Sequence, residues 1–236
     1  MFKKILILLL LSISCPAFSD SDKDLDFTLS DFCFKQPSVQ DRGGVLYLPN
    51  QQIGITAKST CVYKDEFGQF YSQGRLKNGV RNGKWIFWHK NGAVHKEQFW
   101  INGLKQGAFT NWFEDGQKEA KRVYKDDVLK EMSMWSESGE TRMTSSEDLK
   151  TGNLKLTFYI SGIITAIGTV INTPIGELTK HGKWTYYFSD SGLRYLEGNY
   201  KNDEKVGSWI EWNKTGQNII KTSTYKDGKC VSGDCN

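Results

Sequence analysis

Apolar and polar positions recur along this chain with a fixed period. Each period ends with an aromatic residue, a few mostly polar residues and a glycine, and these closing glycines stand at 68, 92, 116, 139, 162, 192 and 216. Their intervals are 24, 24, 23, 23, 30 and 24 residues. The endings are "YKDEFG" (63–68), "WHKNG" (88–92), "WFEDG" (112–116), "WSESG" (135–139), "FYISG" (158–162), "YFSDSG" (187–192) and "WNKTG" (212–216). Self-similarity at a fixed period predicts a repeat protein.

The interior of each unit predicts two β-strands. Eight residues after a closing glycine comes an apolar or aromatic position, as at Trp100 and Tyr200, and a turn sequence such as "ING" (101–103) or "KDG" (226–228) usually follows. Asn-Gly and Asp-Gly supply the positive φ angles of tight hairpin turns. No sustained helical stripe of apolar residues is present. Unit 140–162 is degenerate and one residue short. The long unit, which ends at Gly192, carries an insert near 171–182.

We therefore predict an all-β fold, an elongated single-layer antiparallel sheet of tandem β-hairpins in which each unit contacts mainly its neighbours. About seven units extend over 44–236, after a non-repeat segment at 20–43. Glycines at fixed places in the units are the predicted framework of the repeat: Gly68, Gly83, Gly92, Gly107, Gly116, Gly139, Gly162, Gly192, Gly207 and Gly216.

Aromatic residues occur in pairs three positions apart, as in Trp85 and Trp88, which a regular strand places on opposite faces. A single-layer sheet with aromatic residues on both faces has no thick core, so its rings must stack along the sheet, with an aromatic residue of the intervening strand between them. We expect most rings to be framework. One face would stay partly open as a candidate binding surface for a partner: Trp88, Trp112, Trp135, Tyr187 and Trp212.

The run "LTFYISGIITAIGTVI" (156–171) is uncharged over sixteen residues. Its glycines and β-branched residues argue against a membrane span and favour a hairpin in register with the repeat. It is the least polar part of the array. We expect it to pack against a partner, another copy or the inserted loop, and Ile164→Asp and Ile167→Asp would test this through solubility and self-association.

The units resemble the MORN-variant repeat of bacterial proteins. The pattern "Y-x-N-G-x-x-x-G-x-W-x-x-W-x-x-x-G" is present in Leu76–Gly92, Trp100–Gly116 and Tyr200–Gly216, and "GVLYLPNQQ" (44–52) resembles a segment that commonly precedes such arrays. The resemblance implies an extended hairpin sheet used for protein or membrane-surface contacts, and some members are labelled antitoxins. It brings no catalytic residues. The degenerate unit and the long insert depart from a regular array.

The N-terminus resembles a secretory signal peptide over 1–19. Lys3 and Lys4 precede an apolar run, and small residues lead to a predicted cleavage between Ser19 and Asp20. The protein is therefore expected in the periplasm or outside the cell. Lipid anchoring through Cys15 is the less favoured alternative, because Ser12 and Pro16 fit lipoprotein processing poorly.

Four cysteines remain after that cleavage, and an even number in an oxidising compartment indicates structural disulfides. Cys230 and Cys235 are close enough in sequence to close a short loop. Of the three connectivities, we favour Cys230–Cys235 with Cys33–Cys61.

Charge and motifs exclude several function classes. The whole chain has 31 Lys and Arg and 27 Asp and Glu. Removal of the signal peptide takes away Lys3 and Lys4, so 29 basic and 27 acidic residues remain. This balance does not suit a nucleic-acid partner. His89, His95 and His181 have no neighbours at metal-ligand spacing. Since nucleophile, phosphate-loop and metalloprotease motifs are also absent, we expect no enzyme, no metal and no cofactor.

The expected function is binding of another macromolecule, most simply a protein, through an extended β surface. Two alternatives remain open. Stacked aromatic rings also suit a cell-wall or glycan-binding module, and the family label suggests an immunity or antitoxin protein acting in the envelope. Lysines near the turns could meet anionic lipid or cell-wall polymer, although interspersed acids favour ordinary solvated turns.

Overall fold

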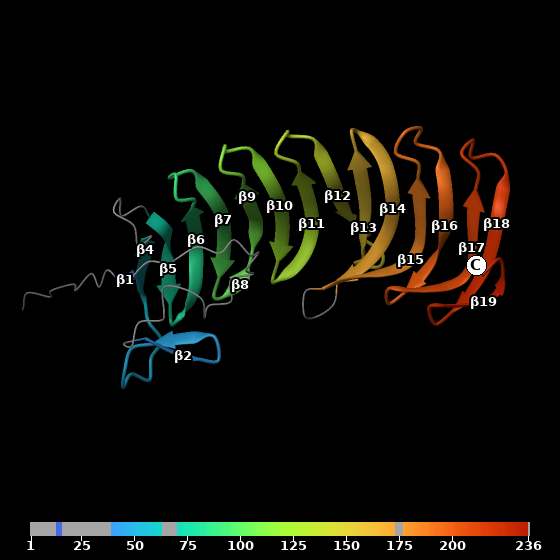
Figure 1. Cartoon of the computed structure of the whole chain (residues 1–236). Helices are drawn as coiled ribbons and strands as arrows, with labels where there is room; N and C mark the ends of the chain where they lie inside the picture. The colour runs from blue at the N-terminus through green and yellow to red at the C-terminus, as the bar shows by residue number, and fades with distance from the viewer. Residues whose placement is uncertain (1–12, 16–38, 63–69, 173–176, 236) are drawn as a thin grey trace, which may run out of the picture. The chain divides into compact units, whose positions relative to one another are not determined.

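The computed structural model describes residues 13–15, 39–62, 70–172 and 177–235 (Figure 1). It divides into two compact units, Met1–Gly116 and Gln117–Asn236, and each is treated by itself below. The described residues of both units form strands and turns without a helix. No helix that could cross a membrane therefore occurs in these segments.

The first unit is a meander of antiparallel strands with a small additional sheet. Its meander strands are β4 (Ala57–Val62), β5 (Phe70–Lys77), β6 (Val80–Trp88), β7 (Val94–Ile101), β8 (Leu104–Lys105) and β9 (Gly107–Trp112). Each of β4 to β6 pairs with the next strand, and β7 pairs with both β8 and β9. β1 (Ile13–Cys15), within the predicted signal peptide, pairs with β4 in parallel.

The two-stranded sheet of β2 (Gln40–Arg42) and β3 (Val45–Tyr47) stands outside this meander. Leu46 of β3 is fully buried, and its backbone N–H donates to the carbonyl of Gly79 in the β5–β6 turn at 3.1 Å. The segment expected before the repeat array thus packs on the first tight turn of the meander.

The second unit is an uninterrupted row of antiparallel strands, each paired with the next along the chain (Figure 1). The strands are β10 (Lys118–Lys125), β11 (Val128–Trp135), β12 (Thr141–Glu147), β13 (Leu154–Ile160), β14 (Ile163–Asn172), β15 (Leu178–Tyr187), β16 (Arg194–Lys201), β17 (Glu204–Trp212), β18 (Ile219–Lys226) and β19 (Lys229–Gly233). The predicted all-β fold class, an open antiparallel sheet of tandem hairpins, is confirmed.

The turns follow the predicted chemistry. In the tight turns, both central residues have positive φ, as at Asn102 (48°) and Gly103 (85°) or Asn202 (52°) and Asp203 (66°). Every predicted framework glycine within the described residues also has positive φ, between 65° and 86°. Gly68 lies outside the described residues. Because L-residues rarely adopt this region, the periodic glycines are explained by backbone conformation.

The degenerate unit keeps both strands, but its longer loop and its two-residue turn have exchanged places relative to the other units. β12 and β13 are joined by a longer loop, in which Gly152 donates to the Asp148 carbonyl at 2.7 Å. β13 and β14 are joined by a two-residue turn of Ser161 and Gly162, both with positive φ. The longer loop and the shorter turn nearly offset each other. The strand pattern therefore persists where the sequence pattern fades.

A five-residue motif, a cation followed by x-Gly-x-Trp, recurs at the start of the second strand of several hairpins. The cations are Arg81, Lys180 and Lys205, and their charged groups lie 4.8, 4.7 and 4.4 Å from the ring centroids of the tryptophans four residues later. Their backbone carbonyls accept N–H bonds from the next tight turn, given by Gly103, Asp203 and Gly228 at 2.9, 3.0 and 3.1 Å. Each cation therefore covers its own hairpin's indole and joins that hairpin to the next.

The buried rings form the predicted ladders along the sheet. In the second unit, Tyr200 of β16 lies edge-on between Trp184 and Trp209, at centroid distances of 6.1 and 5.0 Å. In the first unit, Trp100 meets Phe109 edge-on at 5.3 Å. The expectation that an aromatic residue of the intervening strand lies between the rings of successive hairpins is confirmed at Tyr200 in the second unit.

Two sequence predictions concern the cysteines and the cleavage site. The Cys230–Cys235 disulfide is confirmed and closes the turn at the end of β19. Cys61 is also disulfide-bonded, but its expected partner Cys33 lies outside the described residues. So do Ser19 and Asp20, and the predicted cleavage stays a prediction.

Candidate functional site

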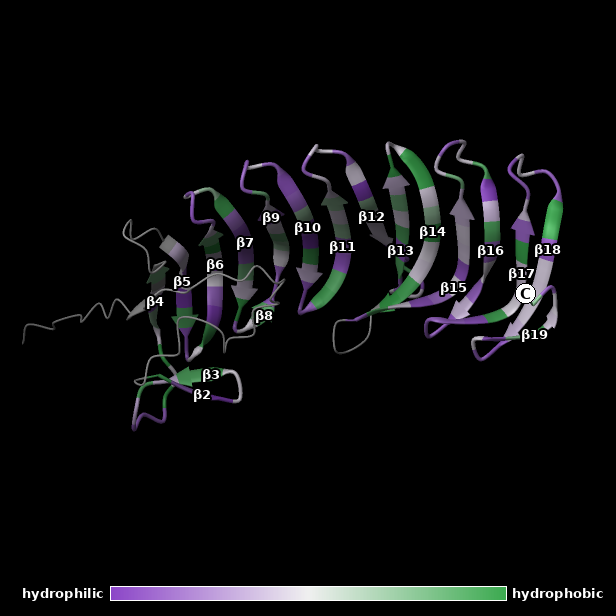
Figure 2. Cartoon of the chain, in the orientation of Figure 1, coloured by the Kyte–Doolittle hydropathy of each residue, from purple (hydrophilic) through white to green (hydrophobic). Residues whose placement is uncertain are grey.

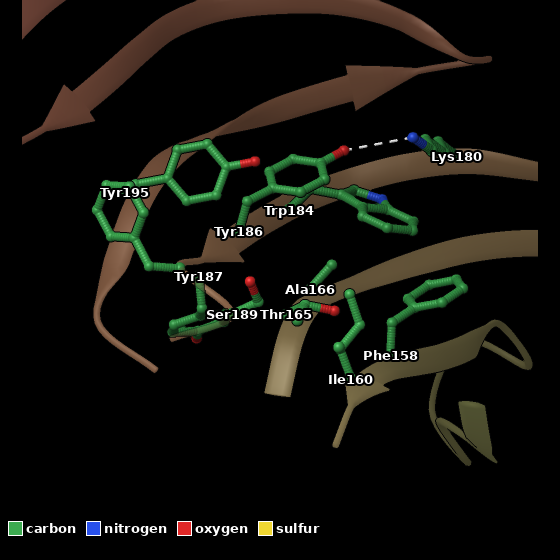
Figure 3. Close-up of a pocket in the computed structure, with 11 residues that line it drawn as sticks. Phe158, Ile160, Thr165, Ala166, Lys180, Trp184, Tyr186, Tyr187, Ser189 and Tyr195 are labelled. Carbon is green, nitrogen blue, oxygen red and sulfur yellow. Dashed lines mark hydrogen bonds between the residues drawn. The ribbon is translucent and has the colours of Figure 1, made fainter. Parts of the chain in front are cut away.

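An open groove of about 610 Å³ lies on the second unit (Figure 3). β13, β14, β15, β16 and the β15–β16 turn provide its lining. The lining residues are Phe158, Ile160, Thr165, Ala166, Lys180, Trp184, Tyr186, Tyr187, Phe188, Ser189 and Tyr195. This volume is in the range of small-molecule sites.

The groove arises from a small residue between two aromatic ones. Ala166 of β14 pairs with Phe158 of β13 on one side and with Tyr186 of β15 on the other. Side chains at paired positions stand on the same face of a sheet. The methyl group of Ala166 therefore forms a low floor between two rings.

The aromatic wall on the β15 side is continuous. Trp184 and Tyr186, two residues apart on one strand, stack with centroids 5.9 Å apart and planes at 28°. Tyr195 lies 6.3 Å from Tyr186 and 4.9 Å from Phe188. Across the floor, Phe158 lies 6.1 Å from Trp184. The rings support one another, so the wall is preorganised for contact with an apolar group.

One end of the groove is polar. Lys180 Nζ lies 3.3 Å from Tyr186 Oη, and Tyr186 Oη lies 3.2 Å from Tyr200 Oη. Burial raises the pKa of Tyr186, and burial with the hydrogen bond to Tyr186 raises the pKa of Tyr200 to about 12. Both phenols stay protonated at neutral pH. Their mutual hydrogen bond uses one of the two phenol protons, and the other proton is left to donate beside an ammonium group.

The other end is formed by the uncharged run 156–171, where Ile160 lines the groove and is 53% exposed. Ile164 is 37% exposed but does not line the groove. Much of β14 is coloured hydrophobic in Figure 2. The sequence-based hypothesis singled out this run, and it provides Phe158, Ile160, Thr165 and Ala166 to the groove.

The predicted binding-surface aromatics do not come together at this groove. They share a position at the end of the second strand of their hairpins, where a register shift precedes Trp88, Trp135, Tyr187 and Trp212. Only Tyr187 lines the groove. Trp88 and Trp112, partly buried, belong to the first unit. Trp135 is also partly buried, whereas Trp212 is 5% exposed beneath the Arg194 guanidinium, 4.2 Å from its ring.

Within the aromatic pairs, the first ring is the more deeply buried one. Trp85, Phe109, Trp184 and Trp209 are 1%, 6%, 2% and 2% exposed, and the second ring is less buried in each pair. The first rings are therefore framework in both units.

Sequence reasoning missed Lys180, Tyr186, Phe188 and Tyr195 as site residues. The run "WTYYF" (184–188) carried a signal, because Trp184 and Tyr186 alternate on one strand. What the pattern could not supply was the neighbour: the groove depends on Ala166, which is close to Tyr186 only through strand register.

The histidines form no metal site. His89 and His95 stack at a centroid distance of 4.3 Å, and His89 Nε2 donates to the Trp112 carbonyl at 2.9 Å. Burial, Lys96 and His89 lower the pKa of His95 to about 3. Among the residues that the structure describes, no three His, Cys, Asp or Glu side chains are grouped to hold a metal ion.

Comparison with known proteins gives no assignment: no family model matches the chain, and no curated protein matches it.

Proposed function

We propose that this chain is an exported, non-catalytic binding protein that recognises another protein through the groove of its second unit. The observation that carries the proposal is that Ile160, which is 53% exposed, lines the groove together with its aromatic wall. A preorganised aromatic pocket beside an exposed aliphatic side chain is typical of surfaces where partner side chains become buried.

Three features support an exported binding protein. The N-terminus resembles a signal peptide, and a disulfide closes the end of the last strand. The repeats resemble MORN-variant arrays, for which the resemblance implies binding surfaces. We infer a protein that works in the periplasm or outside the cell.

A glycan is the second candidate ligand. Its support is the combination of ring faces with the hydroxyl groups of Tyr186, Tyr195, Ser189 and Thr165 along one groove. Sugars use both kinds of contact. Retention of the protein on purified peptidoglycan, lost in Tyr195→Ala, would favour this candidate over a protein partner.

The test is a crosslinking pull-down from envelope extracts, followed by calorimetry with each captured partner after purification. We expect one partner to be retained by the wild-type protein and lost in Ile160→Asp. The matched control is Ile219→Asp, which changes an isoleucine of β18 that is 58% exposed and does not line the groove. Equal retention by both variants, or no retained protein, would contradict the proposal.

A further inference from the structure

The groove has a charge that its own lining does not neutralise. Among the described residues that line it, Lys180 is the only charged one. The ion pairs found among the described residues include Lys183 with Glu197 at 2.9 Å, but none involves Lys180. The Lys180 ammonium instead lies over the rings of Trp184 and Tyr200, at 4.7 and 4.9 Å, and donates to Tyr186 Oη.

The repeat separates the structural role of this lysine from a binding role. Lys205 occupies the same motif position, with its Nζ 4.4 Å from the Trp209 centroid and 4.9 Å from the Tyr225 centroid. Its carbonyl likewise accepts from the next turn. Lys205 does not line the groove. Lys180 and Lys205 therefore have the same role in the fold, and binding of a ligand at the groove should depend on Lys180 alone.

We propose that the groove binds a carboxylate together with an adjacent bulky apolar side chain, both presented by one segment of the partner protein. The carboxylate meets Lys180 Nζ and the Tyr186 hydroxyl, and the apolar side chain lies on Ala166 between Phe158 and Tyr195. Charge complementarity argues for this occupant, because the lining residues that the structure describes include one cation and no acid. The inference rests on the proposed protein-binding function.

The chemistry of the polar end favours a carboxylate over a neutral amide. An ammonium group and a protonated phenol both donate hydrogen bonds, and bonds from a charged donor to a carboxylate are about twice as strong as neutral ones. Apolar walls on both sides limit competition from water. Figure 3 shows the Lys180 ammonium directed at the Tyr186 hydroxyl, with Phe158 and Ile160 on the other side of the groove.

The test uses three synthetic hexapeptides and isothermal titration calorimetry on the whole protein. The first has a Leu-Glu pair between glycines and capped ends, the second has Leu-Gln, and the third has Leu-Gln with a free C-terminal carboxylate directly after the pair. We expect the first to bind about tenfold more tightly than the second, as one charge-assisted contact predicts. The third shows whether a terminal carboxylate serves as well as a side chain.

Four variants identify the residues on which peptide binding and the preference for Glu over Gln depend. Lys180→Met should remove the preference for Glu over Gln, and Lys180→Arg should keep most of it. Lys205→Met, the matched control for the loss of a cation from the same motif, should leave the preference unchanged. Ala166→Leu should fill the floor of the groove and weaken binding of all three peptides, while its circular dichroism spectrum reports whether the sheet is intact.

The outcomes separate the inference from the proposed function. Equal binding of the Glu and Gln peptides, sensitive to Ala166→Leu, would overturn the carboxylate inference and leave protein binding standing. A preference lost equally in Lys180→Met and Lys205→Met would also overturn it, because the lysine would then act through the fold. If no peptide binds but a hexagalacturonate does, both proposals are wrong and an acidic glycan is the ligand. If neither the peptides nor the hexagalacturonate bind, the inference is also overturned.

Discussion

At the scale of single residues, three strand glycines are explained by the indole that covers them. Gly74, Gly168 and Gly198 have ordinary φ angles, yet a Cβ at each would overlap the ring of Trp85, Trp184 or Trp209. Their role differs from that of the turn glycines, where positive φ is the constraint. The ring occupies the space left by the missing side chain, and so a large aromatic residue can lie flat on a single-layer sheet.

Gly198→Ala should destabilise the protein by about 1–3 kcal/mol, because the Trp209 ring must move away. Urea unfolding measures the change. In Gly198→Ala/Trp209→Phe the smaller ring relieves part of the overlap, so the double variant should lose less than the sum of the two single changes. Gly162→Ala, where a Cβ meets nothing within 4 Å but φ is +77°, is the control for backbone strain alone. Strict additivity would contradict the packing explanation.

At the scale of elements, the hairpin is joined to its neighbour by more than strand pairing. The backbone N–H of Asp203, in the β16–β17 turn, donates to the Lys180 carbonyl, and its side-chain Oδ1 accepts from the Lys180 backbone N–H at 2.8 Å. The cation of one hairpin is thereby held by the turn of the next. This arrangement also positions Lys180 at the polar end of the groove.

Asp203→Ala should cost about 1–2 kcal/mol, because it removes the hydrogen bond to Lys180 and places alanine at a positive φ of 66°. Asp203→Gly removes the same bond without the conformational cost, so its loss of stability should be smaller. Asp203→Asn retains an acceptor and tolerates this φ, so it should stay near the wild type. Chemical denaturation of the three variants gives the order, and a larger loss in glycine than in alanine would contradict it.

At the scale of the whole molecule, we expect the two units to differ in their response to acid. The first unit contains His95, stacked on His89 and followed by Lys96, and its pKa is lowered to about 3 from 6.5. Between these values the unfolded chain binds a proton that the native state does not. The contribution of His95 to stability is thus present above about pH 6.5 and falls as the pH decreases.

From about pH 7.5 to about pH 4.5, we expect the first unit to lose about 1 kcal/mol through His95, a value reduced for its partial exposure. Hydrogen exchange at the two pH values, corrected for intrinsic rates, should show β6 and β7 losing protection. His95→Gln should remove this loss and leave the exchange of the second unit unchanged. Equal acid sensitivity in the wild type and the variant would contradict the assignment to His95.

The sequence predicted the kind of surface that forms the site, but not which aromatic residues line it. The uncharged run 156–171 indicated an apolar surface, and that surface provides one side of the groove. The predicted binding-surface aromatics share a repeat position that directly follows a bulge, as at Trp88 and Trp212. A register shift changes the face that a side chain occupies, and it cannot be read from spacing alone.

The sequence by itself determined the all-β class, the hairpin period, the turn positions and the ladder of rings, because these depend on local φ preferences and on repetition at a fixed spacing. Only the tertiary structure decided which rings are buried and where the surface opens. The groove requires Ala166 to pair with Phe158 and Tyr186 at the same level of three strands, and Lys180 to be held by Asp203 of the next hairpin. Such coincidences depend on register and on bulges, which are set by packing between strands.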